Sequence, residues 1–249
     1  EGNSQLKTTF NQEKLRLIQN LKNDKHPIIC HGFQSSKAIF ENPDLKGRNF
    51  VFRLMRNEPQ YLMDLAKVTP WGFRKLYYLA SWFQTKSIFK KLLTHKKIAR
   101  SNGSIGTSNH SFEIAEFRGP SETFYKQGLG SFCLYHADLS KRENEFAAQW
   151  LLEHVFNELE IPFVVAGKNP SDELEKAAHV RMHTCLVANP GDKEMKELIK
   201  KAQIIFQPSF IEHQSKIDAL QDLLLGRHVL VNPKGAKMNP FESLLEVAE

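Results

Sequence analysis

The sequence predicts an α/β protein with two Rossmann-like, doubly wound domains, of which the N-terminal one is incomplete. In the second half, short β-rich apolar runs alternate with helical patterns, which favours a parallel sheet with helices on both faces. The first half offers three candidate strands, too few for a complete domain of this kind. The 249 residues, 41% apolar and 25% charged, indicate a globular chain. We expect domains over residues 1–128 and 129–249, joined by a glycine-containing linker near 117–130.

The first half combines a few short elements with one long helical pattern. A helix is expected over residues 12–21, and strands are expected over 27–31, 49–54 and 104–108. The long pattern, over residues 71–97, interleaves aromatic residues with lysines and an arginine. It fits either a helix lying on an anionic membrane surface or a packed helix with a solvated basic face.

The second half is more regular. Strands are expected over residues 132–135, 161–166, 184–188, 204–207 and 228–231. Ser140 and Glu143 fit a capping box that would start the helix after the first of these strands. Ser215 and Gly226 fit the N-cap and the C′ residue of a later helix, and Asn239 fits the N-cap of a last one.

Charge and cysteine usage narrow the class of protein. A net charge of +6 favours an anionic partner, although an ordinary basic cytosolic protein fits as well. Cys30, Cys133 and Cys185 are far apart and lie in apolar runs, so we expect buried, reduced thiols and a reducing, cytoplasmic compartment. The sequence shows neither a transmembrane run nor a basic-then-apolar leader.

Ligands of doubly wound sheets bind beyond the carboxyl ends of the strands. The segments at these ends are rich in small and polar residues, which ordinary turn chemistry would also explain. They cover residues 136–140, 167–171, 189–192, 208–212 and 232–234. Lys216 falls in the first turn of a helix, where a cation is unfavourable unless an anionic ligand offsets it. Lys168, just after a strand-end glycine, is a second candidate for such a contact, and solvated lysines are the alternative.

Several segments carry a resemblance to a known superfamily. The runs FVVAGKNPS at residues 163–171, KKAQIIFQPS at 200–209 and GRHVLV at 226–231 resemble, in order and spacing, the donor domain of group 1 retaining glycosyltransferases of the GT-B fold. The run YHADLSKREN at residues 135–144 resembles a segment of a mannosyltransferase-like branch. Arg53, Glu58 and Tyr61 match the R-T-H-N-I-E-x-x-Y motif of that branch.

The resemblance implies a GT-B fold and transfer of a sugar, mannose in the resembling branch, from a nucleotide-sugar donor to a hydroxyl acceptor in glycan or polysaccharide assembly. No Asp-x-Asp motif is present, so neither a metal nor another cofactor is expected. The residues expected to bind the donor are His136, Gly167, Lys168, Asn189, Pro190, Ser209, Lys216 and Gln221. The candidates for catalysis or acceptor positioning are His31, Arg53, Glu58 and Glu212.

The sequence also departs from the family pattern. The Glu-x7-Glu pair of retaining members falls on His213 and Gln221, while Glu212 is one residue out of register. Met55 and Arg56 replace the His and Asn of the first motif. A non-catalytic binding or scaffold protein with the same fold is therefore the alternative function. A nucleic-acid-binding module is suggested by charge alone, and since no dedicated motif is present, nucleic acid is not an expected partner.

Overall fold

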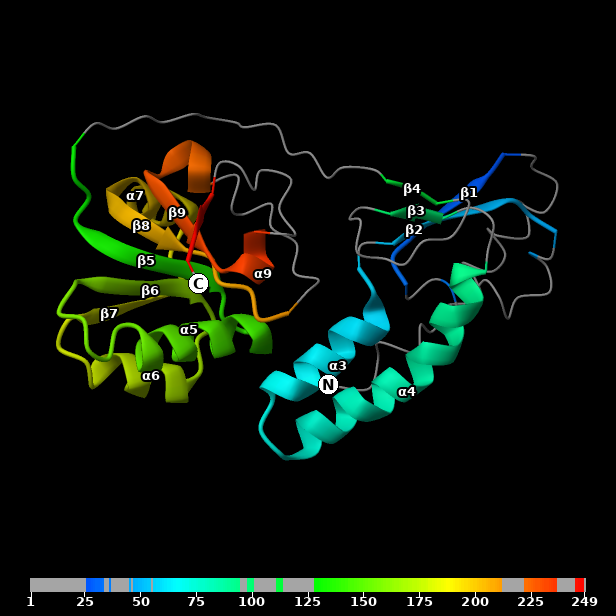
Figure 1. The fold of residues 1–249 in the computed structure, drawn as a ribbon, viewed down its shortest axis with the longest axis horizontal. Coiled ribbons are helices and arrows are strands. Elements are labelled where there is room, and N and C mark those ends of the chain that lie inside the picture. Colours follow the sequence, from blue (N-terminus) through cyan, green and yellow to red (C-terminus); the bar gives the residue numbers. More distant parts are fainter. Residues whose placement is uncertain are drawn as a thin grey trace. The chain divides into compact units, whose positions relative to one another are not determined.

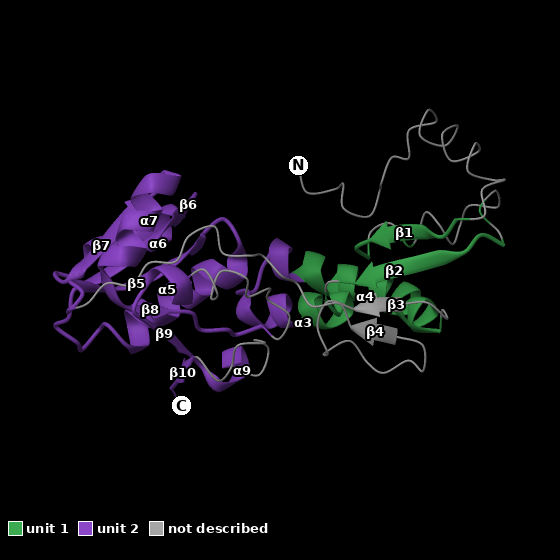
Figure 2. Cartoon of the chain, turned by 90° about the horizontal axis from the view of Figure 1, so that it is seen from above, with its two compact units in different colours: residues 1–63, 76–116 green, residues 64–75, 117–249 purple. Residues whose placement is uncertain are grey.

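The computed structural model describes residues 26–33, 36, 45, 47–54, 56–94, 98–100, 111–113, 128–211, 222–236 and 245–248. The chain divides into two compact units (Figure 2). Unit 1 combines residues 1–63 with 76–116, and unit 2 combines residues 64–75 with 117–249. The expected helix at 12–21, the first residues of the expected helix after Asn239 and most of the expected linker lie outside the described residues. The last helix is not borne out at its far end, where residues 246 and 247 form a strand that pairs with the sheet of unit 2.

Unit 1 is built on a parallel sheet in the order β1-β2-β3-β4 (Figure 1). Its strands are β1 (Ile28–His31), β2 (Phe50–Leu54), β3 (Ile98–Arg100) and β4 (Ser111–Glu113). The first two confirm the expected strands, the expected strand at 104–108 lies outside the described residues, and β3 and β4 were not expected. Phe50, Phe52 and Leu54 alternate with less buried residues, so one face of β2 packs in the core with Phe89 and Leu92.

Two helices follow β2 in the chain. The helix α3 (Glu58–Val68) was not expected, although Asn57 accepts a hydrogen bond from the Gln60 N–H and so caps its first turn. Pro70 cannot continue this helix. The helix α4 (Phe73–Leu93) confirms the core of the expected 71–97 helix. No helix in the described part of the chain is long and apolar enough to cross a membrane.

Unit 2 is a doubly wound parallel sheet in the order β10-β9-β8-β5-β6-β7 (Figure 1). Its strands are β5 (Phe132–Asp138), β6 (Phe163–Lys168), β7 (Thr184–Ala188), β8 (Ala202–Phe206), β9 (His228–Val231) and β10 (Glu246–Val247). Its helices include α5 (Arg142–His154), α6 (Asp172–His179), α7 (Asp192–Lys201) and the short α9 (Pro233–Ala236). The five expected strands are confirmed, with β6 beginning at Phe163 rather than 161, and β10 is additional.

The core of unit 2 lies on both faces of this sheet. On one face, Phe163 and Val165 pack with Leu151 and Leu152 of α5. On the other face, Leu134, Ala166 and Ile205 pack with Ile199 of α7 and Val229 of β9. Successive residues of one strand therefore enter opposite cores, as the pleat requires.

The three cysteines are free, but they differ in burial. Burial raises the pKa of the Cys30 thiol to about 11 and also raises the pKa of Cys133. The expectation that all three are buried is wrong for Cys185, which is exposed. It lies on β7, the edge strand of the unit 2 sheet, beyond which no strand of the described residues pairs.

Candidate functional site

The order of strands in unit 2 marks one position at the sheet's carboxyl edge. From β5 the chain winds outward through β6 and β7, and then crosses to β8 and winds outward in the opposite direction. The topological switch point therefore lies between β5 and β8, which are hydrogen-bonded neighbours. Doubly wound sheets bind their ligands at this point.

A buried polar network occupies the switch point. Nε2 of His136, on β5, lies 2.7 Å from Oδ1 of Asp222, and Nε2 of Gln207, just after β8, donates to Oδ2 of Asp222 at 2.8 Å. Asp222 is 0% exposed. Because an ionised carboxylate only accepts hydrogen bonds, His136 must carry its proton on Nε2 in this contact. Asp222 thus fixes the side chains of both strand ends.

The ends of β6 and β7 are tied together by two asparagines. Asn169 and Asn189 both adopt a left-handed backbone, with φ of 50° and 53°. The Asn169 N–H donates to Oδ1 of Asn189 at 2.8 Å, and the Asn189 N–H donates to the Gly167 carbonyl at 2.8 Å. The side chain of Asn189 therefore orders this edge of the sheet, and Pro190 beside it is buried.

Gly167 lies at the end of β6, where no side chain fits. A Cβ there would overlap the carbonyl oxygen of Ala137 on β5 and would lie 2.8 Å from Cγ of Leu139. The absence of a side chain thus allows the end of β6 to lie close against the segment that follows β5.

We expect Gly167→Ala to lower the free energy of unfolding by about 1–3 kcal/mol, because the backbone of Ala137 must shift to admit the methyl group. Gly191→Ala is the matched control, since nothing lies within 4 Å of a Cβ at that position. Urea unfolding followed by circular dichroism measures both. Equal midpoints for the two variants would contradict the expected close approach.

The turn between β5 and α5 differs from the expected capping box. Ser140 does not cap the helix; its Oγ donates to Oδ1 of Asp138 at 2.6 Å, and the N-cap is Lys141, without a side-chain hydrogen bond. The physical reason is competition, since Asp138 lies two residues away and offers a charged acceptor. Asn144 completes the turn by donating to the Asp138 carbonyl at 2.9 Å.

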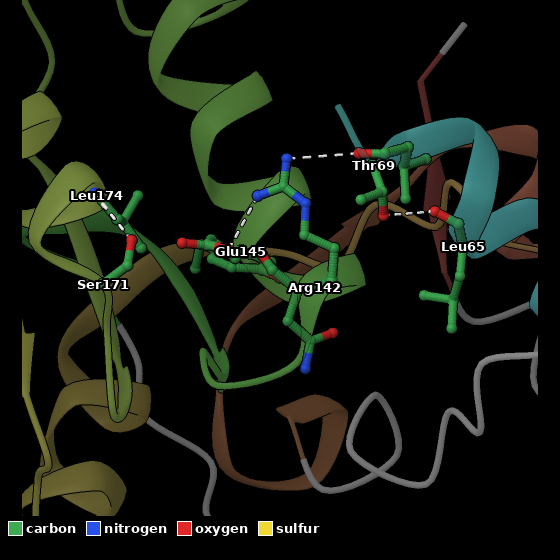
Figure 3. Close-up of polar contacts among 9 residues, drawn as sticks. Leu65, Thr69, Arg142, Glu145, Ser171 and Leu174 are labelled. Atoms are coloured by element: carbon green, nitrogen blue, oxygen red, sulfur yellow. Dashed lines mark hydrogen bonds and ion pairs between the residues drawn. The ribbon is translucent and has the colours of Figure 1, made fainter. Parts of the chain in front are cut away.

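Arg142 in the first turn of α5 is a residue that the sequence analysis did not single out. Its Nη1 donates to Glu145 at 2.9 Å, and its Nη2 lies 3.4 Å from the carbonyl of Val68 at the end of α3 (Figure 3). Nε of Arg142 is buried and has no partner among the described residues. The Arg142 guanidinium therefore lies near the carboxyl end of α3, where the helix dipole is negative. Residue 68 belongs to the same unit as Arg142, unit 2.

Ser209 belongs to a second polar cluster, after β8. It is 0% exposed, its N–H donates to Oδ1 of Asn232 at 3.0 Å, and its Oγ donates to the Ile211 carbonyl at 2.8 Å. Nζ of Lys234 donates to the Phe210 carbonyl at 2.9 Å. The hydroxyl of Ser209 is thus used within the loop, and its expected contact with a donor stays a prediction.

In the described part of unit 2, the N-termini of the three long helices already have negative charge beside them. α5, α6 and α7 all carry acidic residues in their first turns, and Ser171 caps α6 by accepting from the Leu174 N–H at 3.2 Å (Figure 3). These acids already complement the positive ends of the helix dipoles. Lys168 is exposed at the end of β6. Three further predicted residues, Glu212, Lys216 and Gln221, lie outside the described residues.

In unit 1 the structure brings His31 and Arg53 together. They are register partners at the carboxyl ends of β1 and β2, so both side chains leave the same face of the sheet. His31 is exposed. Nε of Arg53 is buried without a hydrogen-bond partner among the described residues.

Glu58, the third candidate of unit 1, is held by a residue that departs from the family motif. Arg56 donates to both carboxylate oxygens of Glu58, at 2.8 and 3.1 Å, and its guanidinium carbon lies 3.5 Å from the ring centroid of Tyr61. Burial lowers the pKa of Arg56, but the hydrogen bond and charge of Glu58, together with Tyr61, raise it above its ordinary value. Arg56, at a position that departs from the motif, thus contacts two of the three retained residues, Glu58 and Tyr61.

The described residues contain no group of three His, Cys, Asp or Glu side chains placed to hold a metal ion. The sequence analysis missed Asp222, Gln207, Arg142 and the pairing role of Arg56. Gln207 had a detectable signal, since it is the polar residue that ends the strand predicted over residues 204–207. Asp222 had none, because its partner His136 lies 86 residues away in the chain.

Comparison with known proteins rests on structure. No protein-family model and no curated protein matches the sequence. A trehalose-6-phosphate synthase studied for enzymatic glycosyltransfer with retention is similar at 8% identity and a TM-score of 0.59, over 96% of this chain and 67% of that chain. TarM is similar at 11% identity and a TM-score of 0.59, over 90% of this chain and 44% of that chain. A structure from E. coli described as trehalose-6-phosphate bound with UDP-2-fluoro glucose is similar at 9% identity and a TM-score of 0.56, over 96% of this chain and 66% of that chain.

The chain spans about two thirds of the first and third of these structures and less than half of TarM. At such low identity the likeness concerns the fold, and it extends over nearly all of this chain. Together with the two parallel sheets, it establishes that the chain has an α/β fold of the GT-B glycosyltransferase type.

Proposed function

We propose that the protein is a glycosyltransferase that moves a sugar, with retention, from a nucleotide-sugar donor to a hydroxyl acceptor. The observation that carries the proposal is the buried network of His136, Asp222 and Gln207 at the switch point of a GT-B-type sheet. A buried carboxylate is costly unless it is fully hydrogen-bonded. The presence of this buried carboxylate at the expected ligand position supports a role in ordering the donor site.

The proposed chemistry is electrostatic. As the bond between sugar and diphosphate breaks, negative charge grows on the departing diphosphate, and cations already in place stabilise it. Lys168, exposed at the end of β6, and Lys216 are the proposed cations. His136, held by Asp222, offers a fixed polar ring at the switch point, and no metal or other cofactor enters the proposal.

Mannose is the sugar that we propose, and assembly of a glycan or polysaccharide is the proposed setting. The support is the resemblance of residues 135–144 to the mannosyltransferase-like branch. Arg53 and His31, adjacent at the strand ends of unit 1, are the proposed residues for positioning the acceptor.

Titration calorimetry with a panel of nucleotide sugars, including GDP-mannose and UDP-glucose, tests the proposal. We expect at least one to bind, and we expect Lys168→Ala and Lys216→Ala each to weaken that binding about 10- to 100-fold, because each removes a charge-assisted contact. Lys176→Ala is the matched control, since Lys176 is exposed in the last turn of α6, away from the carboxyl edge. No heat with any member of the panel would refute donor binding.

The second candidate function is a non-catalytic binding or scaffold protein of the same fold. The pairing of Arg56 with Glu58 favours it, because an engaged carboxylate is a weaker base or hydrogen-bond acceptor for a substrate. The substitution of both glutamates of the family pair points the same way. Donor that binds but remains intact after long incubation with candidate acceptors would favour this function over transfer.

We further propose that the protein works in the cytoplasm, at the inner face of the plasma membrane. The free thiols of Cys30, Cys133 and Cys185 support a reducing compartment. The exposed aromatic and basic side chains of α4 support the membrane location.

A further inference from the structure

Helix α4 has apolar side chains on two opposite faces. Its buried residues, Ser81, Thr85, Phe89 and Leu92, recur in steps of three or four, and the last two pack in the core of unit 1. A second apolar series recurs at the same spacing on the other side of the helix and is exposed. We call it the outer face of α4, and it consists of Phe73, Leu76, Tyr77, Ala80 and Phe83.

The exposure of this outer face is unusual for aromatic residues. Phe73 is 93% exposed and Phe83 is 76% exposed, and Trp71, just before the helix, is 80% exposed. Single exposed apolar residues are common on soluble proteins, but a helical series of aromatic residues marks an interaction surface. In the described part of the chain the rings of Phe73 and Phe83 are thus largely uncovered.

The charge around the outer face has one sign. Between residues 65 and 112 the sequence contains nine of the 34 Lys and Arg residues and none of the 28 acids. The rest of the chain therefore has three more acids than bases, although the whole carries +6. On α4 itself the exposed cations are Arg74, Lys86, Lys90 and Lys91, and Nζ of Lys75 lies 5.1 Å from the ring centroid of Trp71.

We propose that the outer face of α4 docks on the surface of an anionic phospholipid bilayer. The helix lies in the plane of the interface, with Phe73 and Phe83 at the boundary between headgroups and acyl chains. The cations on its flanks reach lipid phosphates along their apolar stems. Trp71 and Tyr77 suit the same depth, where amphipathic rings concentrate.

A bilayer matches both properties of this surface at once. Its anionic headgroups lie directly above its hydrocarbon layer. The basic side chains of one helix face can therefore contact the headgroups while the aromatic side chains of the same face enter the hydrocarbon. A duplex nucleic acid offers phosphates but no apolar layer for Phe73 and Phe83. The proposal takes the inner leaflet from the proposed function, but it does not require sugar transfer.

Vesicle co-sedimentation of the full chain, without a nucleotide sugar, tests the docking. We expect binding to phosphatidylcholine vesicles that contain phosphatidylglycerol, at least about tenfold weaker binding to phosphatidylcholine alone, and a loss of binding in high salt. Replacing Lys86, Lys90 and Lys91 by Gln should weaken binding about 100-fold at low salt. Phe73→Ser with Phe83→Ser should weaken it at least about tenfold on the same vesicles.

A matched pair of substitutions provides the control. Val180 and Met182, in the turn after α6, are as exposed as the two phenylalanines, and replacing both by Ser should leave vesicle binding unchanged. Circular dichroism of every variant checks that α4 still forms.

Equal binding to neutral and anionic vesicles, or full binding by the Phe73→Ser/Phe83→Ser variant, would overturn the proposal. So would tighter binding to an oligonucleotide than to vesicles, or a dimer that both Phe substitutions abolish. None of these outcomes decides whether a nucleotide sugar binds unit 2.

Discussion

Replacing Asp222 by alanine should lower the free energy of unfolding by about 2–5 kcal/mol, because two partly buried donors lose the buried charged acceptor that they share. Nε2 of His136 and Nε2 of Gln207 lie 2.7 and 2.8 Å from the two carboxylate oxygens, and the carboxylate is inaccessible to water. Urea unfolding followed by circular dichroism measures the loss.

Asp222→Asn separates the charge of Asp222 from its shape. The Asn oxygen still accepts from His136, and the Gln207 amide can turn over so that its oxygen accepts from the new amide group. We therefore expect a smaller cost than for Asp222→Ala, about 1 kcal/mol. If the network orders the donor site, the alanine variant also loses affinity for the nucleotide sugar more strongly than the asparagine variant. If both variants unfold at the same urea concentration as the unmodified chain, the network contributes nothing to the free energy of unfolding.

Phe163→Ala should cost about 3–5 kcal/mol, a loss comparable to that of Asp222→Ala. The Phe163 ring stacks on Phe156 with centroids 3.8 Å apart, and Phe206 approaches it edge-on at 6.5 Å. Removing this ring leaves a cavity between β6, β8 and the segment after α5, so both packing and burial are lost.

Phe83→Ala is the control for this effect. Phe83 is a phenylalanine of the exposed face of α4, so its removal should change stability by less than about 0.5 kcal/mol. Both variants are compared by urea unfolding under the same conditions. A loss at Phe163 no greater than the loss at Phe83 would contradict the stacked core of unit 2.

The regular alternation in residues 131–249 was sufficient to predict the strands of unit 2, because each buried strand is an apolar run bounded by turn residues. In unit 1, β3 and β4 escaped prediction because each has three residues, too few to show a period. α3 did leave local signals: Asn57 before it, Pro59 in its first turn and Pro70 after it.

Contacts between residues far apart in the chain limit how much of the candidate site the sequence can predict. Topology rules place His136 and Gly167 at the carboxyl edge of the sheet, and the structure finds them there. Strand order is a long-range property, so neither the edge position of Cys185 nor the neighbourhood of β5 and β8 could be derived from local patterns. The failed cap at Ser140 has a different cause: two acceptable hydrogen-bond arrangements compete, and local sequence does not rank them.

The paired tips after β6 and β7 have a consequence for protein engineering. Residues 169–172 read Asn-Pro-Ser-Asp and residues 189–192 read Asn-Pro-Gly-Asp, with left-handed asparagines and N-caps of nearly the same backbone angles. Because the two neighbouring loops have similar backbone angles, we expect a segment of one loop to fit at the position of the other. Segments can be grafted from one position to the other, or varied together in a library, while the strands and helices on either side remain as they are. The carboxyl edge of unit 2 is thus a platform on which new binding specificities could be built from a duplicated four-residue frame.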